Sequence, residues 1–330
     1  MRHLYVGDPH VQVSNLKDSQ KLIDFAIETA TKEKIGIITF LGDLFHTHAV
    51  LRVEVIDFWK KAFEQIEEAQ LECRVLVGNH DQPGSKEKEQ EMNALNIFEQ
   101  QDNYNPPPKR TIINEPMIIG GIGYIPYMSN EESFFIAAAG LEKLGATGCL
   151  VAHQTFTGAQ YENGFFSEEG IDPANVPQEQ VISGHIHKTQ QVGKCFYPGT
   201  PKYDTMADAN QEKGIWIIKH DNTGKYIDVE FISTENVVTP ITSYVVLEGE
   251  ELPELNPKAR NYVVLEGKSV WITKMKKKLK NLAQIKVKPT DRINRVDKEN
   301  SVTLEKYLET TFEPIEGVTK KEIKEHLVEV

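Results

Sequence analysis

Five short apolar segments of this chain each end in a small residue that is followed by an aspartate, an asparagine or a histidine. The five junctions are Gly7-Asp8-Pro9-His10, Gly42-Asp43-Leu44-Phe45-His46, Gly78-Asn79-His80-Asp81, Ala152-His153 and Gly184-His185-Ile186-His187. Each apolar segment has the length and composition of a buried strand. Loops beyond the carboxyl ends of strands converge on one crevice in an open α/β sheet, so we expect these five loops to form a single site.

The segments between the junctions have helical periodicity, which indicates crossover units and a sheet covered by helices. Strands are predicted at 3–6, 36–41, 74–77, 117–125, 149–152 and 180–183, and amphipathic helices around 23–30, 55–66 and 134–144. The segment 117–125 contains two adjacent glycines and is interpreted as a strand near a turn. Segments 214–220 and 225–232 flank an Asp-Asn-Thr-Gly sequence, which predicts a hairpin with its turn at 222–224. The fold class is therefore predicted to be α/β.

The junctions carry seven candidate metal ligands. These are Asp8, His10, Asp43, Asn79, His153, His185 and His187. Imidazole, carboxylate and amide donors without thiolates suit manganese, iron or zinc rather than copper(I) or an iron–sulfur cluster. Seven donors exceed what one ion takes when a substrate position stays open, so two ions are expected, with Asp43 as the candidate bridge. Such a pair, about 3.5–4 Å apart, would hold the attacking and leaving oxygens of a phosphoryl transfer.

The five junctions, in this order, resemble the five signatures of the calcineurin-like metallophosphoesterases. The resemblance covers roughly residues 1–235 and implies a two-sheet sandwich flanked by helices, with manganese as the expected metal. It also implies that Asp8, His10, Asp43 and His187 hold one ion. Asp43, Asn79, His153 and His185 would then hold the other. His80 would act on the leaving group or the transition state.

Further segments indicate a branch of this family. Phosphoprotein phosphatases carry Asp-Arg-Gly soon after the second signature, and that sequence is absent here. Instead, Ile125-Pro126-Tyr127, Tyr197-Pro198-Gly199-Thr200-Pro201 and Lys213-Gly214-Ile215-Trp216 are similar to segments of three related nucleases. These are the nuclease subunit of the bacterial SbcCD complex, its eukaryotic meiotic-recombination counterpart, and the T-even phage recombination endonuclease subunits. The length of the chain is closer to the phage members. In such nucleases a histidine at the place of His46 assists exonuclease action on duplex ends.

The resemblance implies phosphodiester hydrolysis in DNA, as an exonuclease on duplex ends and an endonuclease on single strands. The two ions would lower the pKa of the attacking water and bind the non-bridging phosphate oxygens. His80 would donate to the departing sugar oxygen or stabilise the charge that develops, and Asp81 would orient His80. The expected role is recombination and double-strand-break processing with an SbcC-type, SMC-like ATPase.

Charge is distributed unevenly along the chain. The formal net charge is -12, yet residues 256–296 contain twelve Lys and Arg against two acids, which makes this segment +10 and the remainder -22. A helix predicted over 269–283 places Ile272, Met275, Leu279 and Leu282 on one face, beside a following strand at 285–289. The candidate DNA-binding lysines of this helix and strand are Lys274, Lys276, Lys277, Lys278, Lys280, Lys286 and Lys288. Their contacts with phosphates would be salt-dependent and largely independent of base sequence.

The segment 297–330 reads as two short acidic helices with apolar stripes. The stripe residues that we expect to bind a partner are Leu304, Tyr307, Leu308, Ile323 and Leu327. In the nuclease family this part of the chain docks on the coiled-coil base of the ATPase, a helix-in-groove contact. The predicted domains are thus a metallophosphoesterase domain at 1–238, a small basic α+β capping domain at 239–296 and a helical tail at 297–330.

The remaining features concern location. The first residues lack the segments of a signal peptide, and no apolar run approaches the roughly 20 residues of a membrane span. The three cysteines form no Cys-x-x-Cys pair, so neither a disulfide framework nor a zinc–cysteine site is expected. We expect a cytoplasmic protein without membrane contact, in the host cytoplasm if a phage encodes it. A homodimer is compatible with the sequence.

Several alternatives stay open at this point. The same metal site would serve a small-molecule or cyclic-nucleotide phosphodiesterase, which would not need the +10 segment. A noncatalytic recombination scaffold is disfavoured because no signature ligand is missing. The lysines could form an ordinary solvated helix face, and the tail could pack on its own capping domain. His46 could serve packing alone, and His48 is interpreted as a surface or satisfied residue.

Overall fold

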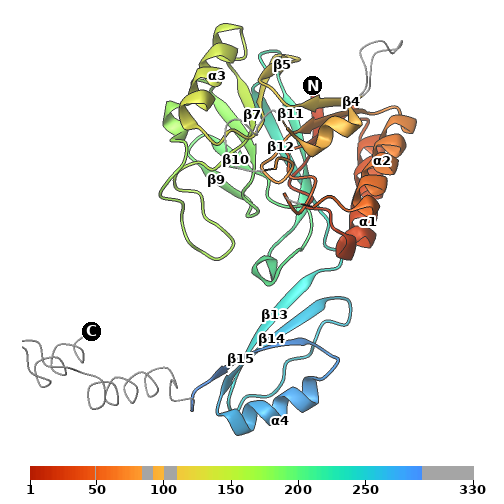
Figure 1. Ribbon diagram of the computed structural model, residues 1–330, viewed down its shortest axis with the longest axis vertical. Coiled ribbons are helices and arrows are strands. Elements are labelled where there is room, and N and C mark those ends of the chain that lie inside the picture. The colour runs from red at the N-terminus through yellow and green to blue at the C-terminus, as the bar shows by residue number, and fades with distance from the viewer. Residues whose placement is uncertain (49, 84–91, 100–109, 292–330) are drawn as a thin grey trace, which may run out of the picture. The chain divides into compact units, whose positions relative to one another are not determined.

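The computed structural model describes residues 1–48, 50–83, 92–99 and 110–291, and these divide into two compact units. The first unit comprises Met1–Ser243 together with Asn256–Asn261. It is built on two six-stranded mixed sheets (Figure 1). Within the described ranges, no helix combines the length and the apolar content needed to cross a bilayer.

The first sheet contains the three strands that precede the first three junctions. In spatial order its strands are β12 (Tyr226–Ser233), β11 (Gly214–His220), β1 (Arg2–Val6), β2 (Ile37–Phe40), β3 (Glu72–Leu76) and β4 (Arg110–Ile113). Strands β1 to β4 are parallel, and β11 pairs antiparallel with β1. Val6 pairs with Phe40, and Phe40 pairs with Val75. This register brings the carboxyl ends of β1, β2 and β3 to the same edge of the sheet.

The second sheet contains the strands that precede the last two junctions. Its spatial order is β5 (Met117–Ile119), β6 (Ile122–Ile125), β7 (Cys149–His153), β8 (Gln180–Gly184), β10 (Cys195–Tyr197) and β9 (Gln190–Val192). The four inner strands are parallel, and the two outer strands are antiparallel to their neighbours. His153 pairs with Gly184, so the ligand-bearing ends of β7 and β8 also coincide.

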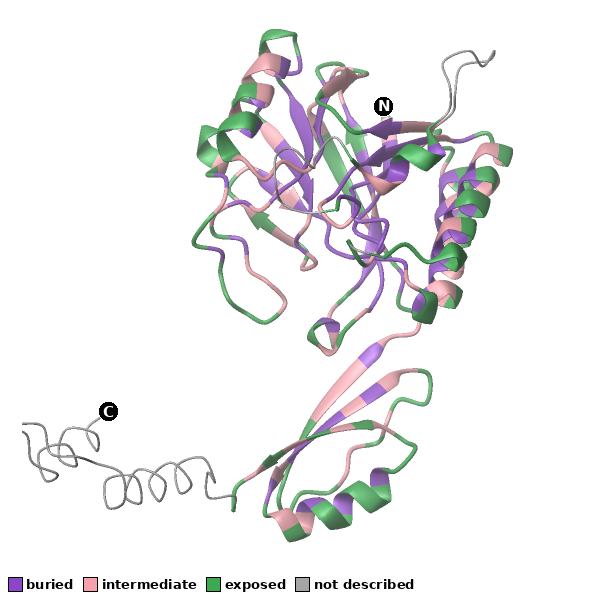
Figure 2. Ribbon diagram, in the orientation of Figure 1, coloured by how far each residue is buried: buried purple, intermediate pink, exposed green. Residues whose placement is uncertain are grey.

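The two sheets pack on each other through a shared apolar core, in which Tyr5, Leu41 and Leu76 meet Tyr124, Val151 and Ile182. Helices α1 (Leu16–Lys32) and α2 (Val53–Glu68) cover the outer face of the first sheet, and α3 (Glu131–Lys143) covers the second (Figure 1). Short 3₁₀ helices lie at Val13–Asn15, Ala94–Phe98, Pro173–Asn175 and Met206–Asp208. The central strands are therefore buried on both faces, while each helix exposes one side (Figure 2). The predicted two-sheet sandwich flanked by helices is confirmed.

Among the described residues, the second unit comprises Tyr244–Leu255 and residues 262–291. Its sheet has the order β13 (Ile241–Leu247), β14 (Arg260–Gly267) and β15 (Gln284–Pro289). Helix α4 (Ser269–Leu279) connects the parallel strands β14 and β15 and packs on them through Ile272, Met275 and Leu279. The hexapeptide Tyr-Val-Val-Leu-Glu-Gly begins at Tyr244 and again at Tyr262, so neighbouring strands carry nearly the same sequence.

Two local expectations need correction. Segment 117–125 forms two antiparallel strands instead of one, because Gly120 and Gly121 both have positive φ (62° and 83°) and make a two-residue hairpin turn. Helix α4 ends at Leu279 rather than near 283, because Asn281 takes a left-handed conformation with φ 69°. Leu282 is consequently 60% exposed and does not join the apolar face of the helix.

Trp59 provides a stability prediction. Its ring is fully buried on α2 among Phe40, Phe58 and Phe63, and its Nε1 donates to the carbonyl oxygen of Leu44 at 3.2 Å. Trp59→Ala should lower the free energy of unfolding by about 3–5 kcal/mol in a denaturant titration. Ile136→Ala on α3, where the side chain is 68% exposed, should change it by less than about 0.5 kcal/mol. Equal effects of the two changes would contradict this packing.

Candidate metal centre

All seven predicted ligands lie together at the carboxyl edge of the two sheets. Asp8 and His10 follow β1, Asp43 follows β2, and Asn79 follows β3. His153 ends β7, and His185 and His187 follow β8. The ligand atoms of Asp8, His10 and His187 lie within 4.8 Å of one another, as do those of Asp43, His153 and His185. Residues separated by up to 179 positions in the chain thus form two adjoining groups.

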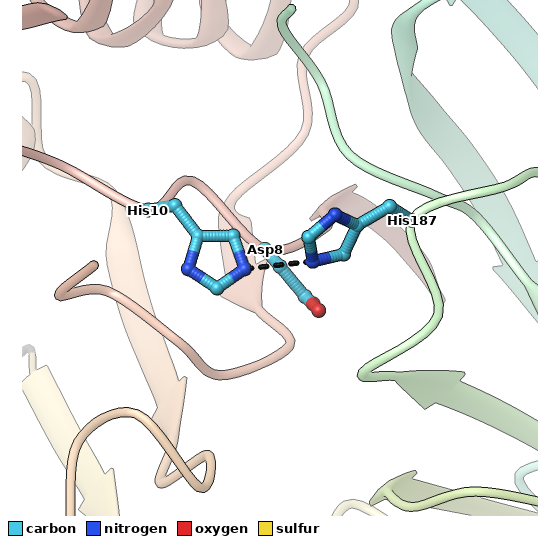
Figure 3. A group of neighbouring side chains, drawn as sticks. All are labelled: Asp8, His10 and His187. Atoms are coloured by element: carbon cyan, nitrogen blue, oxygen red, sulfur yellow. Dashed lines mark hydrogen bonds between the residues drawn. The ribbon is translucent and has the colours of Figure 1, made fainter. Parts of the chain in front are cut away.

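The first group contains Asp8 and His10 from the loop after β1 and His187 from the loop after β8, and the three side chains lie close together (Figure 3). The Nε2 atoms of the two histidines are 2.8 Å apart. Oδ2 of Asp8 accepts a hydrogen bond from the backbone N–H of His185 at 2.7 Å. Oδ1 of Asp8 is buried without a hydrogen-bond partner among the described residues. A buried carboxylate oxygen without a donor is costly unless a cation occupies the adjacent space.

The second group is joined by the amide oxygen of Asn79, which lies 3.0 Å from Nε2 of His153 and 2.7 Å from Nδ1 of His185. Asp43 lies between the two groups, because its Oδ2 is 3.3 Å from Nε2 of His153 and 3.7 Å from Nε2 of His10. Nδ1 of His153 donates to the carbonyl oxygen of Leu41 at 2.7 Å. That hydrogen bond directs Nε2 of His153 into the group as the ligand atom.

The buried carboxylates and imidazoles shift one another's pKa values. Burial raises the pKa of Asp8 to about 6, an effect that His153 opposes and Asp43 reinforces. Burial also disfavours the charged form of His153, but Asp43 and Asp8 outweigh it and raise the pKa of this ring to about 9. Without a cation, a proton on His153 therefore compensates part of the buried negative charge. A divalent ion would replace that proton, as metal binding generally does.

The residues therefore fit a pair of divalent ions. The donors are nitrogen and oxygen atoms, which suit borderline and hard cations. The orphaned Oδ1 of Asp8 and the close approach of the two histidine Nε2 atoms mark the space that the first ion would take. Asp43 has the position expected of a ligand shared by both ions.

Unusual backbone geometry aims the ligands into this space. His10, Asp43 and His185 have positive φ values of 41°, 50° and 82°. Such conformations are rare for residues with a Cβ atom and persist where the surrounding structure imposes them. Gly78 and Gly184 are required because a side chain at either position would not fit. A Cβ atom on Gly78 would lie 2.2 Å from Oδ1 of Asp43, and one on Gly184 would lie 2.6 Å from Oδ1 of Asp8.

His80 and His46 flank the two groups. Nδ1 of His80 donates to the carbonyl oxygen of His46 at 2.7 Å, and the His80 ring packs edge-on against His10 with centroids 4.8 Å apart. His80, His10 and Asp43 form a third set of neighbouring ligand-type side chains. His46 is half-buried 5.7 Å from the ring of His10, and its Nδ1 has no hydrogen-bond partner among the described residues.

The carboxylate of Asp81 is buried against the backbone. It accepts from the N–H groups of Phe45 at 3.1 Å and Gly78 at 2.9 Å, so it ties the second junction to the third. The His80 ring is oriented instead by the hydrogen bond that its Nδ1 donates to the carbonyl oxygen of His46. An orienting effect of Asp81 on His80 would therefore act through the loop backbone and stays a prediction.

Three residues near the centre were not identified from the sequence. His48 is exposed and its Nδ1 lies 2.8 Å from the carbonyl oxygen of Asn79, in agreement with its interpretation as a surface or satisfied residue, but its ring also stacks on His80 with centroids 4.1 Å apart. Oε1 of Glu162 accepts from the backbone N–H of His187 at 3.0 Å, and no motif marks this loop position. Tyr127 stacks on His185 at 5.9 Å. Tyr127 belongs to the Ile-Pro-Tyr segment, which was the one available signal for it.

The other predicted site residues are not part of this cluster. Lys274, Lys276, Lys277, Lys278 and Lys280 lie exposed on or just after α4, and Lys286 and Lys288 lie exposed on β15, all in the second unit. The predicted partner-binding residues Leu304, Tyr307, Leu308, Ile323 and Leu327 lie outside the described residues.

Comparison with known proteins places this geometry in a family. The profile of the calcineurin-like phosphoesterases matches residues 1–189. The chain belongs to this family. Members of the family use divalent metal ions, in agreement with the two candidate groups of ligands.

Two viral proteins are similar to the calcineurin-like phosphoesterase chain. The chain is 28% identical over 263 residues to "Putative phosphoesterase 244L" of Invertebrate iridescent virus 6. This alignment covers 74% of the chain and 88% of the viral protein. The chain is 26% identical over 227 residues to "Exonuclease subunit 1" of Enterobacteria phage T4, which covers 66% of the chain. The latter match spans only 64% of the phage protein.

The metal centre yields a direct prediction. Manganese added to metal-free protein should raise the melting temperature, and an ion at about 100 times its Kd stabilises the fold by about 2.7 kcal/mol. Asp43→Asn should lose most of this increase, because it removes the negative charge that both ions would share. Asp57→Asn, an exposed aspartate on α2, is the control and should keep it. An undiminished shift in Asp43→Asn would contradict the assignment.

Proposed function

We propose that this phosphoesterase is a two-metal DNA nuclease, with manganese as its working metal, that degrades duplex ends and cuts single strands during recombination and double-strand-break processing. The observation that carries the proposal is the similarity to "Exonuclease subunit 1" of phage T4 over 66% of the chain. The exposed lysines of α4 and β15 supply a second, independent argument for a nucleic-acid substrate.

The arrangement of the candidate ligands supports two-metal chemistry. Asp8, His10, Asp43 and His187 would hold one ion, and Asp43, Asn79, His153 and His185 the other. When bound, two such ions lower the pKa of the attacking water and neutralise the non-bridging oxygens of the phosphate. Nδ1 of His80 donates a hydrogen bond to the carbonyl oxygen of His46, which leaves Nε2 facing the site, where it would contact the phosphate or, in the imidazolium form, donate to the departing sugar oxygen. His46 itself would help to place a duplex end.

The lysine surface, defined as Lys274, Lys276, Lys277, Lys278, Lys280, Lys286 and Lys288, would bind DNA phosphates. On β15 the pattern alternates, because Ile285 and Val287 are partly buried while Lys286 and Lys288 are exposed. The helix likewise buries Ile272 and Met275 and leaves its lysines in solvent. One of the seven lysines, Lys288, lies 3.5 Å from Glu266 in an ion pair. Such a surface binds by charge and reads few bases.

The substrate assignment is tested with purified protein on end-labelled duplex DNA, circular single-stranded DNA and a cyclic nucleotide, with manganese or magnesium. Degradation of both DNAs with manganese is expected. Hydrolysis of the cyclic nucleotide alone would favour a small-molecule phosphodiesterase in place of the nuclease.

His80→Asn should keep the manganese-induced thermal shift but reduce DNA turnover by about 10²–10⁴-fold, as loss of a general acid does. Turnover near that of the wild type would refute the role of His80.

The lysine surface is tested by neutralising three of its members together, as Lys276→Gln, Lys277→Gln and Lys278→Gln. We expect weaker DNA binding and a slope of log K against log salt that is smaller by up to about 2.7, since each phosphate contact contributes roughly 0.9. The matched control is Lys60→Gln with Lys61→Gln, two exposed lysines on α2. Binding that is equally salt-dependent in both variants would show that α4 has only a solvated face.

A partner is suggested by the word "subunit" in the name of the phage relative. We extend the proposal to an SbcC-type ATPase that binds the segment 297–330 through Leu304, Tyr307, Leu308, Ile323 and Leu327. Removal of the chain from Asp297 onward should abolish co-purification with the ATPase and leave manganese-dependent nuclease activity. Co-purification of the truncated protein with the ATPase would contradict this part of the proposal.

A further inference from the structure

Two lysines are buried inside the first unit, close to the metal centre. Lys202 follows the Tyr-Pro-Gly-Thr-Pro segment and is 1% exposed, and Lys213 precedes β11 and is 2% exposed. Lysine is almost never fully buried unless it is paired, because the ammonium group loses its hydration. Neither lysine has a part in the chemistry assigned above, so the position of each requires an explanation.

Lys202 belongs to a cluster around the carbonyl oxygen of His10. Its Nζ donates to Oδ1 of Asp204 at 2.5 Å and lies 3.5 Å from the His10 oxygen. Nδ2 of Asn15 donates both to the same His10 oxygen and to Oδ1 of Asp204, each at 3.0 Å. The Lys202–Asp204 pair and Asn15 therefore hold the peptide group of His10 through its carbonyl oxygen.

Lys213 has the same relation to His187. Its Nζ donates to Oδ1 of Asp208 at 2.7 Å, to Oγ1 of Thr200 at 2.8 Å and to the carbonyl oxygen of His187 at 3.2 Å. The backbone N–H of Thr200 donates to that carbonyl as well, at 3.0 Å. Thus a second buried ion pair holds the peptide group of the second histidine ligand.

The two ion pairs are joined by one turn. Oδ2 of Asp208 accepts from the backbone N–H groups of Asp204 at 3.1 Å and Thr205 at 2.9 Å. Asp208 thereby contacts Lys213 through Oδ1 and holds the backbone of Asp204, the partner of Lys202, through Oδ2. The result is a continuous buried network from the His10 carbonyl to the His187 carbonyl.

The network acts on the two histidines of the first group of candidate ligands. The Nε2 atoms of His10 and His187 are 2.8 Å apart, and His10 has a φ of 41°. A strained backbone persists only where its surroundings over-determine it. Buried ion pairs add little net stability compared with apolar residues of the same size, so their retention suggests a geometric role.

We propose that Lys202–Asp204 and Lys213–Asp208 are positioning pairs that hold the backbone of His10 and His187 and so preform the site of the first ion. This inference rests on the proposed two-metal site. It predicts that the first ion, which takes both histidines, depends on the network. The second ion, which takes Asn79, His153 and His185, does not.

The test is a manganese titration followed by the EPR signal of free and bound ion, on the full chain. The variants are Lys213→Met with Asp208→Asn, and Lys202→Met with Asp204→Asn, which remove both charges of a pair at once. The wild type should bind two ions and show the spectrum of a coupled pair. Each double variant should lose the coupled spectrum and bind the first ion about 10–100-fold more weakly, the range for residues that orient ligands. Affinity for the second ion should be unchanged.

The control is Arg74→Met, which removes a buried cation that is 3% exposed and pairs with Glu72 and Tyr124 instead of the ligand loops. It should leave the coupled spectrum intact. If a double variant fails to fold, Asn15→Leu removes a donor to the His10 carbonyl without leaving a buried charge and should weaken the first ion alone. Double variants, or a folded Asn15→Leu, that bind both ions as the wild type does would overturn the positioning role and leave the proposed function standing. A wild type that binds fewer than two ions would instead overturn the two-metal proposal itself.

Discussion

The carboxylates of Asp8 and Asp43 are buried together where the ends of two sheets meet, and the cost of burying their negative charge is the constraint on which the rest of the site depends. Burial and the charge of Asp43 raise the pKa of Asp8, while the surrounding imidazoles offset part of the negative charge. Oδ1 of Asp8 finds no donor among the described residues. Ligands gathered in this way lower their free energy when cations lie between them. The fold therefore brings the candidate metal ligands together before any metal binds.

Bringing these side chains together strains the backbone of the loops, and the buried strands of the sandwich hold the loops in these conformations. Three candidate ligands adopt left-handed conformations, and Gly78 and Gly184 allow carboxylate oxygens to approach closer than a Cβ atom would permit. The strands that precede these turns are buried on both faces, so they give each loop a rigid base. The Asp81 carboxylate of the third junction accepts hydrogen bonds from the backbone N–H groups of Phe45 in the second junction and of Gly78 in its own, and so ties the two junctions together.

The site was largely predictable because its ligands directly follow apolar strands, and the common edge of parallel strands implies convergence. The convergence of the five junctions could be inferred for that reason, whereas the two-sheet sandwich was implied by the resemblance to the calcineurin-like metallophosphoesterases. Strands β4, β9 and β10 were not predicted, since three or four residues between loops have no detectable period. Glu162 and the buried lysines were also beyond reach, because their effect depends on hydrogen bonds between loops that are distant in sequence. The end of α4 depended on the backbone conformation of Asn281 and on no strong sequence signal.

The central claim is that two divalent ions share Asp43 between the ends of the two sheets. Anomalous diffraction at the manganese edge, from crystals grown with manganese, tests it most directly. The account predicts two peaks in the anomalous map, one in contact with Asp8, His10, Asp43 and His187 and the other with Asp43, Asn79, His153 and His185. A map with no peak among these residues, or with a single ion that leaves Asp43 uncoordinated, would contradict the account.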